Sequence, residues 1–339
     1  MEAISAIGEV SDKTLAVVSS FGERLSSWLM HFALQNHGLT TQRISAARVI
    51  RTNNQYLEAD VDFLSTERLC EKHFSPLIRA HIIPVVTGFI GEDTSGSMTL
   101  LGRGGSDYTA SILGVSMRAQ RIEIWTDVDG VLSADPRLVS GTKLWKHIAM
   151  DVMAEMAYGG AKVLHTKTIV AAVAYNIPVV IKNTFNPASI GTTVVPKDGV
   201  GPRGIVVDKH QVLFHLTNPS ILDGVGFINR CSSVFSEYRV PMDVCATSEI
   251  TFTCSISSKD YSSVFDRVLA KIATLEVHRT VAKVSVVGAG IGADPKIWAR
   301  IFSILKGSKL YTVSSGASFN NITFFVDAAQ ADIVLQKLH

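Results

Sequence analysis

The sequence has little that would tie it to a membrane, a nucleic acid or a secretory route. Its most apolar long stretch, residues 161–181, is interrupted by Lys162, His165, Lys167 and Pro178, so a membrane span is not expected. The N-terminus has an early acid and no apolar segment, unlike a secretory signal. A formal net charge of +2 is spread over residues of both signs and forms no basic stripe. We therefore expect a soluble cytoplasmic protein that binds a small molecule, without nucleic-acid or membrane partners.

Cysteine is also scarce and has no metal-binding pattern. The four cysteines lack metal-ligand spacing and stand in apolar stretches: Cys70, Cys231, Cys245 and Cys254. This distribution predicts free thiols in the core, and neither a disulfide framework nor a zinc site is expected. The hydrophobic content of 47% in 339 residues is enough for a large core divided between two or three domains.

The most informative stretch is LGRGGSDYTA at residues 101–110. Its three glycines permit positive φ, and residues 109–119 are apolar at helical spacing, so a turn leading into a helix is predicted. The free N–H groups at such a helix start bind anions, and Arg103 adds a planar fork that suits a carboxylate or phosphate. Taken alone, a glycine-rich turn with an arginine is a weak signal, and a purely structural turn explains it better. Asp107 in the first helical turn is also what helix capping would place there.

Neighbouring stretches favour the functional interpretation. They are TGFIG at 87–91, WTDVDG at 125–130, DPR at 135–137 and GAKVLH at 160–165. In this order and spacing they resemble the amino acid kinase superfamily, specifically aspartate kinase. The resemblance implies an α/β fold, a three-layer αβα sandwich with a mostly parallel sheet. It also implies phosphoryl transfer from ATP to the side-chain carboxylate of L-aspartate, which gives 4-phospho-L-aspartate, the first step of lysine, threonine and methionine (diaminopimelate) biosynthesis.

The resemblance assigns a substrate role to residues of two stretches. Arg103 would hold the α-carboxylate of aspartate, and Ser106 would orient the substrate together with the backbone of Gly104 and Gly105. Glu23, in SFGERLS at residues 20–26, would bind the substrate ammonium. The alternative for Glu23 is compensation of the dipole of a helix that we expect over residues 21–37.

The predicted catalytic residues are Asp107 and Lys162. Asp107 would organise neighbouring cationic groups. A lysine near a helix start opposes the dipole, so Lys162 is better explained by a charge directed at phosphates. The resemblance implies that Mg²⁺ bridges the phosphates of ATP rather than occupying a protein cage. An aromatic residue is frequent in the family where Leu132 stands, so the adenine pocket is expected to differ. The predicted ATP-binding residues are Thr126, Asp127, Arg137, Lys162 and Val163.

The second half of the chain contains two units with one plan. After a linker at 195–202, each unit reads as strand, helix, two strands and a helix, which resembles paired, ferredoxin-like βαββ ACT regulatory domains. We predict the kinase domain at 1–195, the first ACT domain at 205–280 and the second at 281–339. A single module of this kind could be only a dimerisation unit, whereas two behind a kinase domain are more specific. The resemblance implies a homo-oligomer formed through these domains.

An effector site is implied by the stretch MDVCATSE at residues 242–249. In lysine-sensitive aspartate kinases, a strand-end aspartate and a Thr-Ser pair hold the effector. The matching residues here are Asp243, Thr247, Ser248 and Glu249. The resemblance therefore implies lysine as the effector. Without it, a surface acid beside a turn explains Asp243 equally well.

One expected segment is missing from these residues. The Lys-Phe-Gly-Gly strand and loop of the superfamily is not found, so we expect the kinase domain to be incomplete at its N-terminus and its activity to be impaired. A kinase acting on glutamate or carbamate is disfavoured by the string RGGSDYTA and the ACT pair. The remaining alternative is a non-catalytic, effector-binding regulatory chain or a truncated kinase fragment.

Overall fold

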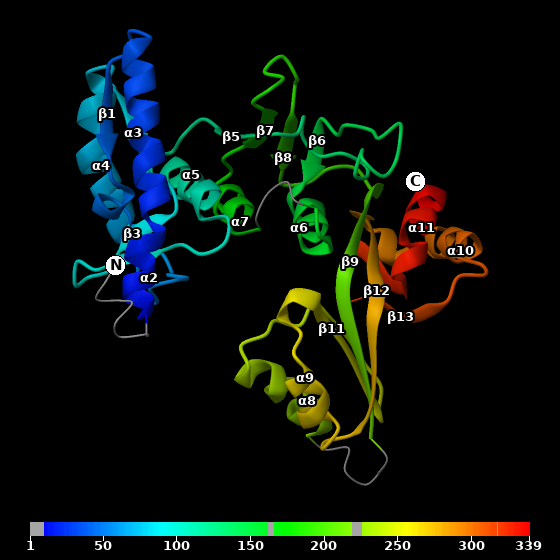
Figure 1. Ribbon diagram of the computed structural model, residues 1–339. Helices are drawn as coiled ribbons and strands as arrows, with labels where there is room; N and C mark the ends of the chain where they lie inside the picture. Colours follow the sequence, from blue (N-terminus) through cyan, green and yellow to red (C-terminus); the bar gives the residue numbers. More distant parts are fainter. Residues whose placement is uncertain (1–9, 162–165, 219–225, 317) are drawn as a thin grey trace. The chain divides into compact units, whose positions relative to one another are not determined.

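The computed structural model describes residues 10–161, 166–218, 226–316 and 318–339 (Figure 1). These residues form two compact units. The first contains Met1–Asp129 and Val163–Pro196, and the second contains Gly130–Lys162 and Lys197–His339. The boundaries predicted for the kinase and ACT domains stay predictions, because compactness groups residues by contact and not by module.

The first unit combines short parallel strand pairs with helices, which confirms the predicted α/β class. β1 pairs with β2 and β5 pairs with β7 in parallel, whereas β3–β4 and β7–β8 are antiparallel. The helical elements are α2 (Asp12–Ser19), α3 (Phe21–Asn36), η1 (Ala46–Arg48), α4 (Phe63–Arg79), α5 (Gly105–Ser116) and α7 (Thr166–Ala174). The strands are β1 (Thr41–Ile44), β2 (Ile83–Val86), β3 (Ile90–Glu92), β4 (Met98–Leu100), β5 (Ile122–Thr126), β7 (Val179–Asn183) and β8 (Thr192–Val195).

Helix α3 has a polar buried face. Ser27 and His31 are buried, whereas Leu29 on the opposite side is 72% exposed. His31 Nδ1 lies 2.8 Å from Thr41 Oγ1, and Arg43 Nε donates to Ser27 Oγ over 2.8 Å. These hydrogen bonds satisfy polar groups that the contact with β1 would otherwise leave unpaired. The helix therefore has a fixed position, which matters because Glu23 lies in its first turn.

The second unit is built on one six-stranded antiparallel sheet with strand order β10-β11-β9-β12-β14-β13. Its strands are β6 (His147–Ala149), which lies outside this sheet, β9 (Gly201–Thr217), β10 (Val244–Thr247), β11 (Thr251–Ser257), β12 (Thr274–Ala289), β13 (Leu310–Ser315) and β14 (Asn321–Asp327). Its helical elements are α6 (Met150–Gly159), α8 (Phe227–Glu237), η3 (Ser258–Asp260), α9 (Ser263–Leu269), η4 (Ile291–Ala293), α10 (Pro295–Ile304), η5 (Ala328–Gln330) and α11 (Ala331–Leu338).

The two longest strands, β9 and β12, each serve both βαββ modules (Figure 1). Residues 211–217 of β9 pair with β11 and with the first part of β12, whereas residues 201–208 pair with the second part of β12. Each module has three strands of its own and gains a fourth from the other module. The sequence predicted the first strand of each module but not its continuation into the other module.

The two modules have separate cores of different composition. The first is rich in aromatic side chains, among them Phe214, Phe235 and Phe265. The second is mainly aliphatic and includes Val284 and Leu335. Two hydrophobic layers on one sheet keep the modules distinct although they share strands.

The prediction that all four cysteines are core thiols is wrong for Cys245. Cys70, Cys231 and Cys254 are buried, but Cys245 is exposed. It lies on β10, where exposed and partly buried residues alternate along the strand. Burial raises the pKa of Cys70 and Cys231 to about 11, so both are protonated, unreactive thiols at neutral pH.

Among the helices that the structure describes, none is long and apolar enough to cross a bilayer.

Candidate functional site

A cavity of about 600 Å³ opens beside the start of α5. This volume suits a small-molecule ligand. The predicted substrate residues from α3 and from the turn before α5 meet there, and their roles stay predictions. The cavity is lined by Glu23, Leu57, Glu58, Phe89, Gly102, Arg103, Gly104, Gly105, Ser106 and Asp107.

The turn before α5 has the backbone that its glycines permit. Gly104 is the N-cap of α5 and has φ of 69°, in the left-handed region. A residue with a side chain would be strained there. The glycines of this turn line the cavity next to Arg103 and Ser106, and the first N–H groups of a helix have no acceptor within the helix. The predicted turn and helix are confirmed, and the turn can bind an anion.

Glu23 is held by two donors, one in the first turn of α5 and one in the loop after β2. Ser106 Oγ donates to Glu23 Oε1 over 2.7 Å, and the backbone N–H of Gly88 donates to Glu23 Oε2 over 3.2 Å. A Cβ on Gly88 would lie 2.8 Å from Ser106 Oγ and 2.9 Å from Glu23 Oε2, so only glycine permits this approach. The loop after β2 therefore fixes the carboxylate at the cavity wall.

Two charges of opposite sign beside the start of α5 have no partner among the described residues. Within the described residues, Arg103 makes no hydrogen bond or ion pair, and its side chain is exposed to the cavity. Asp107 likewise has none, and burial raises the pKa of its carboxyl group. An unpaired cation and an unpaired acid at one opening are available to a ligand that carries both signs of charge.

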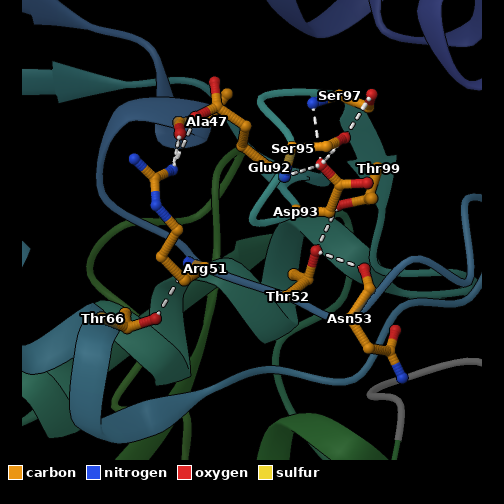
Figure 2. Close-up of polar contacts among 10 residues, drawn as sticks. All are labelled: Ala47, Arg51, Thr52, Asn53, Thr66, Glu92, Asp93, Ser95, Ser97 and Thr99. Atoms are coloured by element: carbon orange, nitrogen blue, oxygen red, sulfur yellow. Dashed lines mark hydrogen bonds and ion pairs between the residues drawn. The ribbon is translucent and has the colours of Figure 1, made fainter.

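The loop 51–60, which contributes Leu57 and Glu58 to the cavity, is held at its start by a polar network (Figure 2). Arg51 Nη1 forms an ion pair with Glu92 Oε1 over 2.9 Å and donates to the carbonyl of Ala47 over 2.8 Å. Thr52 Oγ1 lies 2.7 Å from Thr99 Oγ1. These contacts tie the loop to η1 and to the β3–β4 hairpin.

The sequence analysis missed Leu57 and Glu58 as cavity residues. The backbone N–H of Ala59 donates to the carbonyl of Leu100 over 2.8 Å, which places Glu58 beside the turn that starts at Gly102. A signal was present, because the loop 51–60 carries two acids, Glu58 and Asp60. Gly88 was noted only as part of a motif, and no role was predicted for it.

On the nucleotide side, Thr126 and Asp127 lie together at the carboxyl end of β5. Thr126 Oγ1 donates to Asp127 Oδ1 over 3.1 Å. Asp129 Oδ1, farther along the same loop, accepts hydrogen bonds from Asn183 and Asn186 over 2.8 and 3.1 Å. Asp127 is exposed, so its oxygens can reach a ligand at the end of this parallel strand pair.

Of the other predicted ATP-binding residues, the structure describes Arg137 alone. Arg137 belongs to the second unit, where its guanidinium binds both carboxylate oxygens of Asp135 over 3.0 and 2.7 Å. Lys162 and Val163 lie outside the described residues. A phosphate would have to compete with Asp135 for Arg137.

The predicted effector residues lie at the two ends of β10. Asp243 precedes the strand, and its Oδ2 accepts hydrogen bonds from Gln211 Nε2 over 2.7 Å and from Lys283 Nζ over 3.4 Å. At the other end, Ser248 caps the β10–β11 turn, since its Oγ accepts from the N–H of Thr251 over 3.1 Å. Thr247 and Glu249 flank it and are exposed.

Comparison with known proteins gives matches over almost the whole chain. The amino acid kinase family matches residues 3–183, and an ACT domain family matches residues 284–339. The chain is 31% identical to lysine-sensitive aspartokinase 3 of Escherichia coli. This match covers 94% of this chain and 73% of that protein. It is 30% identical to the chloroplastic aspartokinase 1 of Arabidopsis thaliana, of whose length it spans 62%.

Solved structures give the same result. The structure of E. coli aspartokinase III in complex with aspartate and ADP, called the R-state, matches with a TM-score of 0.85 and 30% identity, over 97% of this chain and 76% of that chain. The complex with lysine and aspartate, called the T-state, matches with a TM-score of 0.84 at the same identity and coverage.

Proposed function

The chain belongs to the aspartokinases of the amino acid kinase family, and from this premise we propose its reaction and its control. The proposed reaction is transfer of the γ-phosphoryl group of ATP to the side-chain carboxylate of L-aspartate. The observation that carries it is the cavity at the start of α5, where Arg103, Glu23 and Ser106 converge. A regulatory chain without catalysis is not favoured, because these groups suit the substrate of the reaction.

Binding of aspartate would use charges that the protein leaves available. Arg103 is free to hold the α-carboxylate with two parallel hydrogen bonds. Glu23 accepts one hydrogen bond at each oxygen, from Ser106 and from Gly88, and a carboxylate has further lone pairs for the substrate ammonium. Because the Glu23 carboxylate is fixed before binding, little ordering of this group remains to be done when the substrate enters.

ATP would bind at the carboxyl end of β5. The hydroxyl of Thr126 and the carboxylate of Asp127 are oxygen donors that suit the ribose and the Mg²⁺-bearing phosphates of the nucleotide. Mg²⁺ bound through those phosphates would neutralise the charge that develops on them. Arg137, Lys162 and Val163 are proposed to complete the nucleotide site. Asp107 is proposed to organise nearby cations, and its partly buried position strengthens any charge interaction there.

The test of the substrate site is Arg103→Lys, because lysine keeps the charge but loses the planar fork. We expect the affinity for aspartate to fall by roughly 1.5–3 kcal/mol, the range for a charge-assisted hydrogen bond, while ATP affinity changes little. Calorimetric titration with each ligand and steady-state kinetics measure this. Arg118→Lys, at an arginine whose side chain is 87% exposed, is the matched control. An unchanged aspartate affinity in Arg103→Lys would contradict the assignment.

We further propose that lysine binds the C-terminal modules and that Asp243, Thr247, Ser248 and Glu249 contribute to its site. Titration of the full chain with L-lysine should show binding that Asp243→Ala weakens. Binding of L-threonine without binding of L-lysine would show that lysine is not the effector. The two βαββ modules on one sheet support this proposal.

Association of copies through the same modules is proposed as well. β10 and β13 are the edges of the six-stranded sheet, and no other described strand pairs with their outer sides. Open strand edges can pair with another chain. Sedimentation analysis would test this, and a concentration-independent monomer would exclude it.

A further inference from the structure

A lysine is buried in the sheet of the second unit. The side chain of Lys283 on β12 is 5% exposed. Its Nζ donates to Asp243 Oδ2 over 3.4 Å and to the carbonyl of Tyr158 over 3.2 Å. An ammonium group out of water is costly unless it is paired and hydrogen-bonded. These two acceptors therefore hold the charge in place.

The strand register brings Asp208 and Gln211 to Lys283 and Asp243. We call these four residues the Lys283 cluster. Lys283 faces Asp208 across the β9–β12 pair, and Val281 faces Gln211 in the same pair. Gln211 Nε2 donates to Asp208 Oδ2 over 2.9 Å and to Asp243 Oδ2 over 2.7 Å. Asp243 thus receives two donors at one oxygen, a neutral amide and an ammonium.

Helix α6 contacts the same unit along one face and reaches Lys283 at its C-terminal end. Asp151 Oδ2 accepts from Asn320 Nδ2 over 2.6 Å, Glu155 accepts from Asn321, and the carbonyl of Tyr158 accepts from Lys283. Positions 151, 155 and 158 follow the helical repeat, so they share a face. The helix ends at Gly159, three residues before the predicted phosphate-binding Lys162. Lys283 therefore touches both the predicted effector carboxylate and the helix that leads to the predicted nucleotide loop.

We propose that Lys283 is an internal counterion of Asp243 and that a cationic effector must displace it to bind. This inference rests on the proposed lysine regulation. Two ammonium groups at one carboxylate repel each other, so the internal contact and the effector contact compete. Displacement also removes the hydrogen bond from Lys283 to Tyr158. Effector binding is in this way linked to the end of α6, and the internal contact lowers the affinity for the effector.

The first test removes the internal cation from the full chain by Lys283→Met, which keeps an unbranched side chain of similar length. Calorimetric titration should show L-lysine binding at least about tenfold more tightly than to the native chain, because the charge pair lost on displacement is worth on the order of a tenfold factor. The exposed control Lys306→Met should leave the affinity unchanged. L-norleucine, which lacks the ε-ammonium group, should not gain affinity. Equal or weaker lysine binding by Lys283→Met would overturn the competition.

A second variant and a stability measurement keep the inference testable if Lys283→Met folds poorly. Lys283→Gln keeps a donor for the Tyr158 carbonyl but has no charge, and it should also bind L-lysine more tightly. Thermal unfolding of Asp243→Asn, Lys283→Gln and the double variant should show strong non-additivity, because the single changes each leave one charge unpaired. Additive shifts would overturn the counterion role. Phosphoryl transfer without lysine tests the proposed reaction separately, since Lys283 does not line the cavity.

Discussion

The cavity at α5 and the cluster around Lys283 both contain charged side chains, but they differ in how those charges are partnered. In the cavity, Arg103 and Asp107 have no partner among the described residues, and only Glu23 is held by donors. In the cluster, Lys283 and Asp243 are bonded to each other. Unpaired charge lowers stability but stays available to a ligand, whereas paired charge supports the fold and must be released before it can bind anything.

The largest expected effect on stability comes from unpairing the cluster. Asp243→Ala leaves the Lys283 ammonium buried, with the Tyr158 carbonyl as its one remaining acceptor among the described residues. Breaking a buried pair costs roughly 3–5 kcal/mol, but the Asp243 side chain is 31% exposed and water can replace part of it. We therefore expect a loss of about 2 kcal/mol in the free energy of unfolding. Urea denaturation measures it.

A matched surface acid gives the control for this comparison. Glu237 at the end of α8 is exposed, and its change to alanine should alter the free energy of unfolding by less than about 0.5 kcal/mol. Arg103→Ala should behave like this control in stability although it affects aspartate binding. If Arg103→Ala were as destabilising as Asp243→Ala, the distinction between free and paired charges would fail.

A smaller effect is expected where the cavity does have fixed partners. Gly88→Ala would place a methyl group 2.8 Å from Ser106 Oγ, so the Glu23–Ser106 hydrogen bond must shift. The clash is with side-chain ends, and we expect a stability loss of about 1 kcal/mol, at the low end for overpacking. The affinity for aspartate should fall by more than the stability does, because the shifted carboxylate binds the substrate ammonium.

Gly22→Ala is the control for the Gly88 prediction. A Cβ on Gly22 meets nothing within 4 Å, and the residue lies in α3 directly before Glu23. Alanine favours a helix, so stability should be unchanged or slightly higher. Calorimetric titration with aspartate compares the two variants. Equal aspartate affinities in both would show that the position of Glu23 is unimportant.

Sequence patterns predicted local elements well because these depend on short-range rules. The turn before α5 was predicted from its glycines, and Gly104 has the left-handed φ that such a turn needs. The two βαββ modules were predicted from alternating apolar residues between helical segments. The full lengths of β9 and β12 were not, because their first halves, residues 201–208 and 274–281, pair with a strand of the other module, and this depends on long-range contacts.

The partners of charged residues were the hardest to predict. Asp243 was expected to be available to an effector, but its oxygen is bonded to Gln211 and Lys283. The sequence contains a signal, since Lys283 interrupts the apolar run Val281-Ala282-Lys283-Val284 on a central strand. A lysine in such a run needs a buried partner, but only the sheet register shows which one. Glu58 was missed for the same reason, because its place in the cavity depends on a loop crossing back to β4.

The smallest predicted effect is a pH-dependent gain in stability from Asp107→Asn. Burial raises the pKa of Asp107, and no described residue compensates its charge. The folded state therefore binds the proton more tightly than the unfolded chain does. The stability cost is fully present above the folded-state pKa and disappears as pH falls through it toward the ordinary aspartate value. Asp107→Asn removes this cost, so its melting temperature should exceed that of the native chain at pH 7 and converge with it in acid.

Asp62 supplies the opposite case. It is the N-cap of α4, and hydrogen bonds from Ser65 lower its pKa, so its contribution to stability is present at neutral pH and is lost as pH falls. Asp62→Ala should therefore melt below the native chain at pH 7, and the difference should shrink in acid. Thermal unfolding of both variants between pH 3 and pH 8 compares them. If Asp107→Asn were destabilising at pH 7, the Asp107 carboxylate would have a stabilising partner, and the cavity would not be the site of unpaired charge.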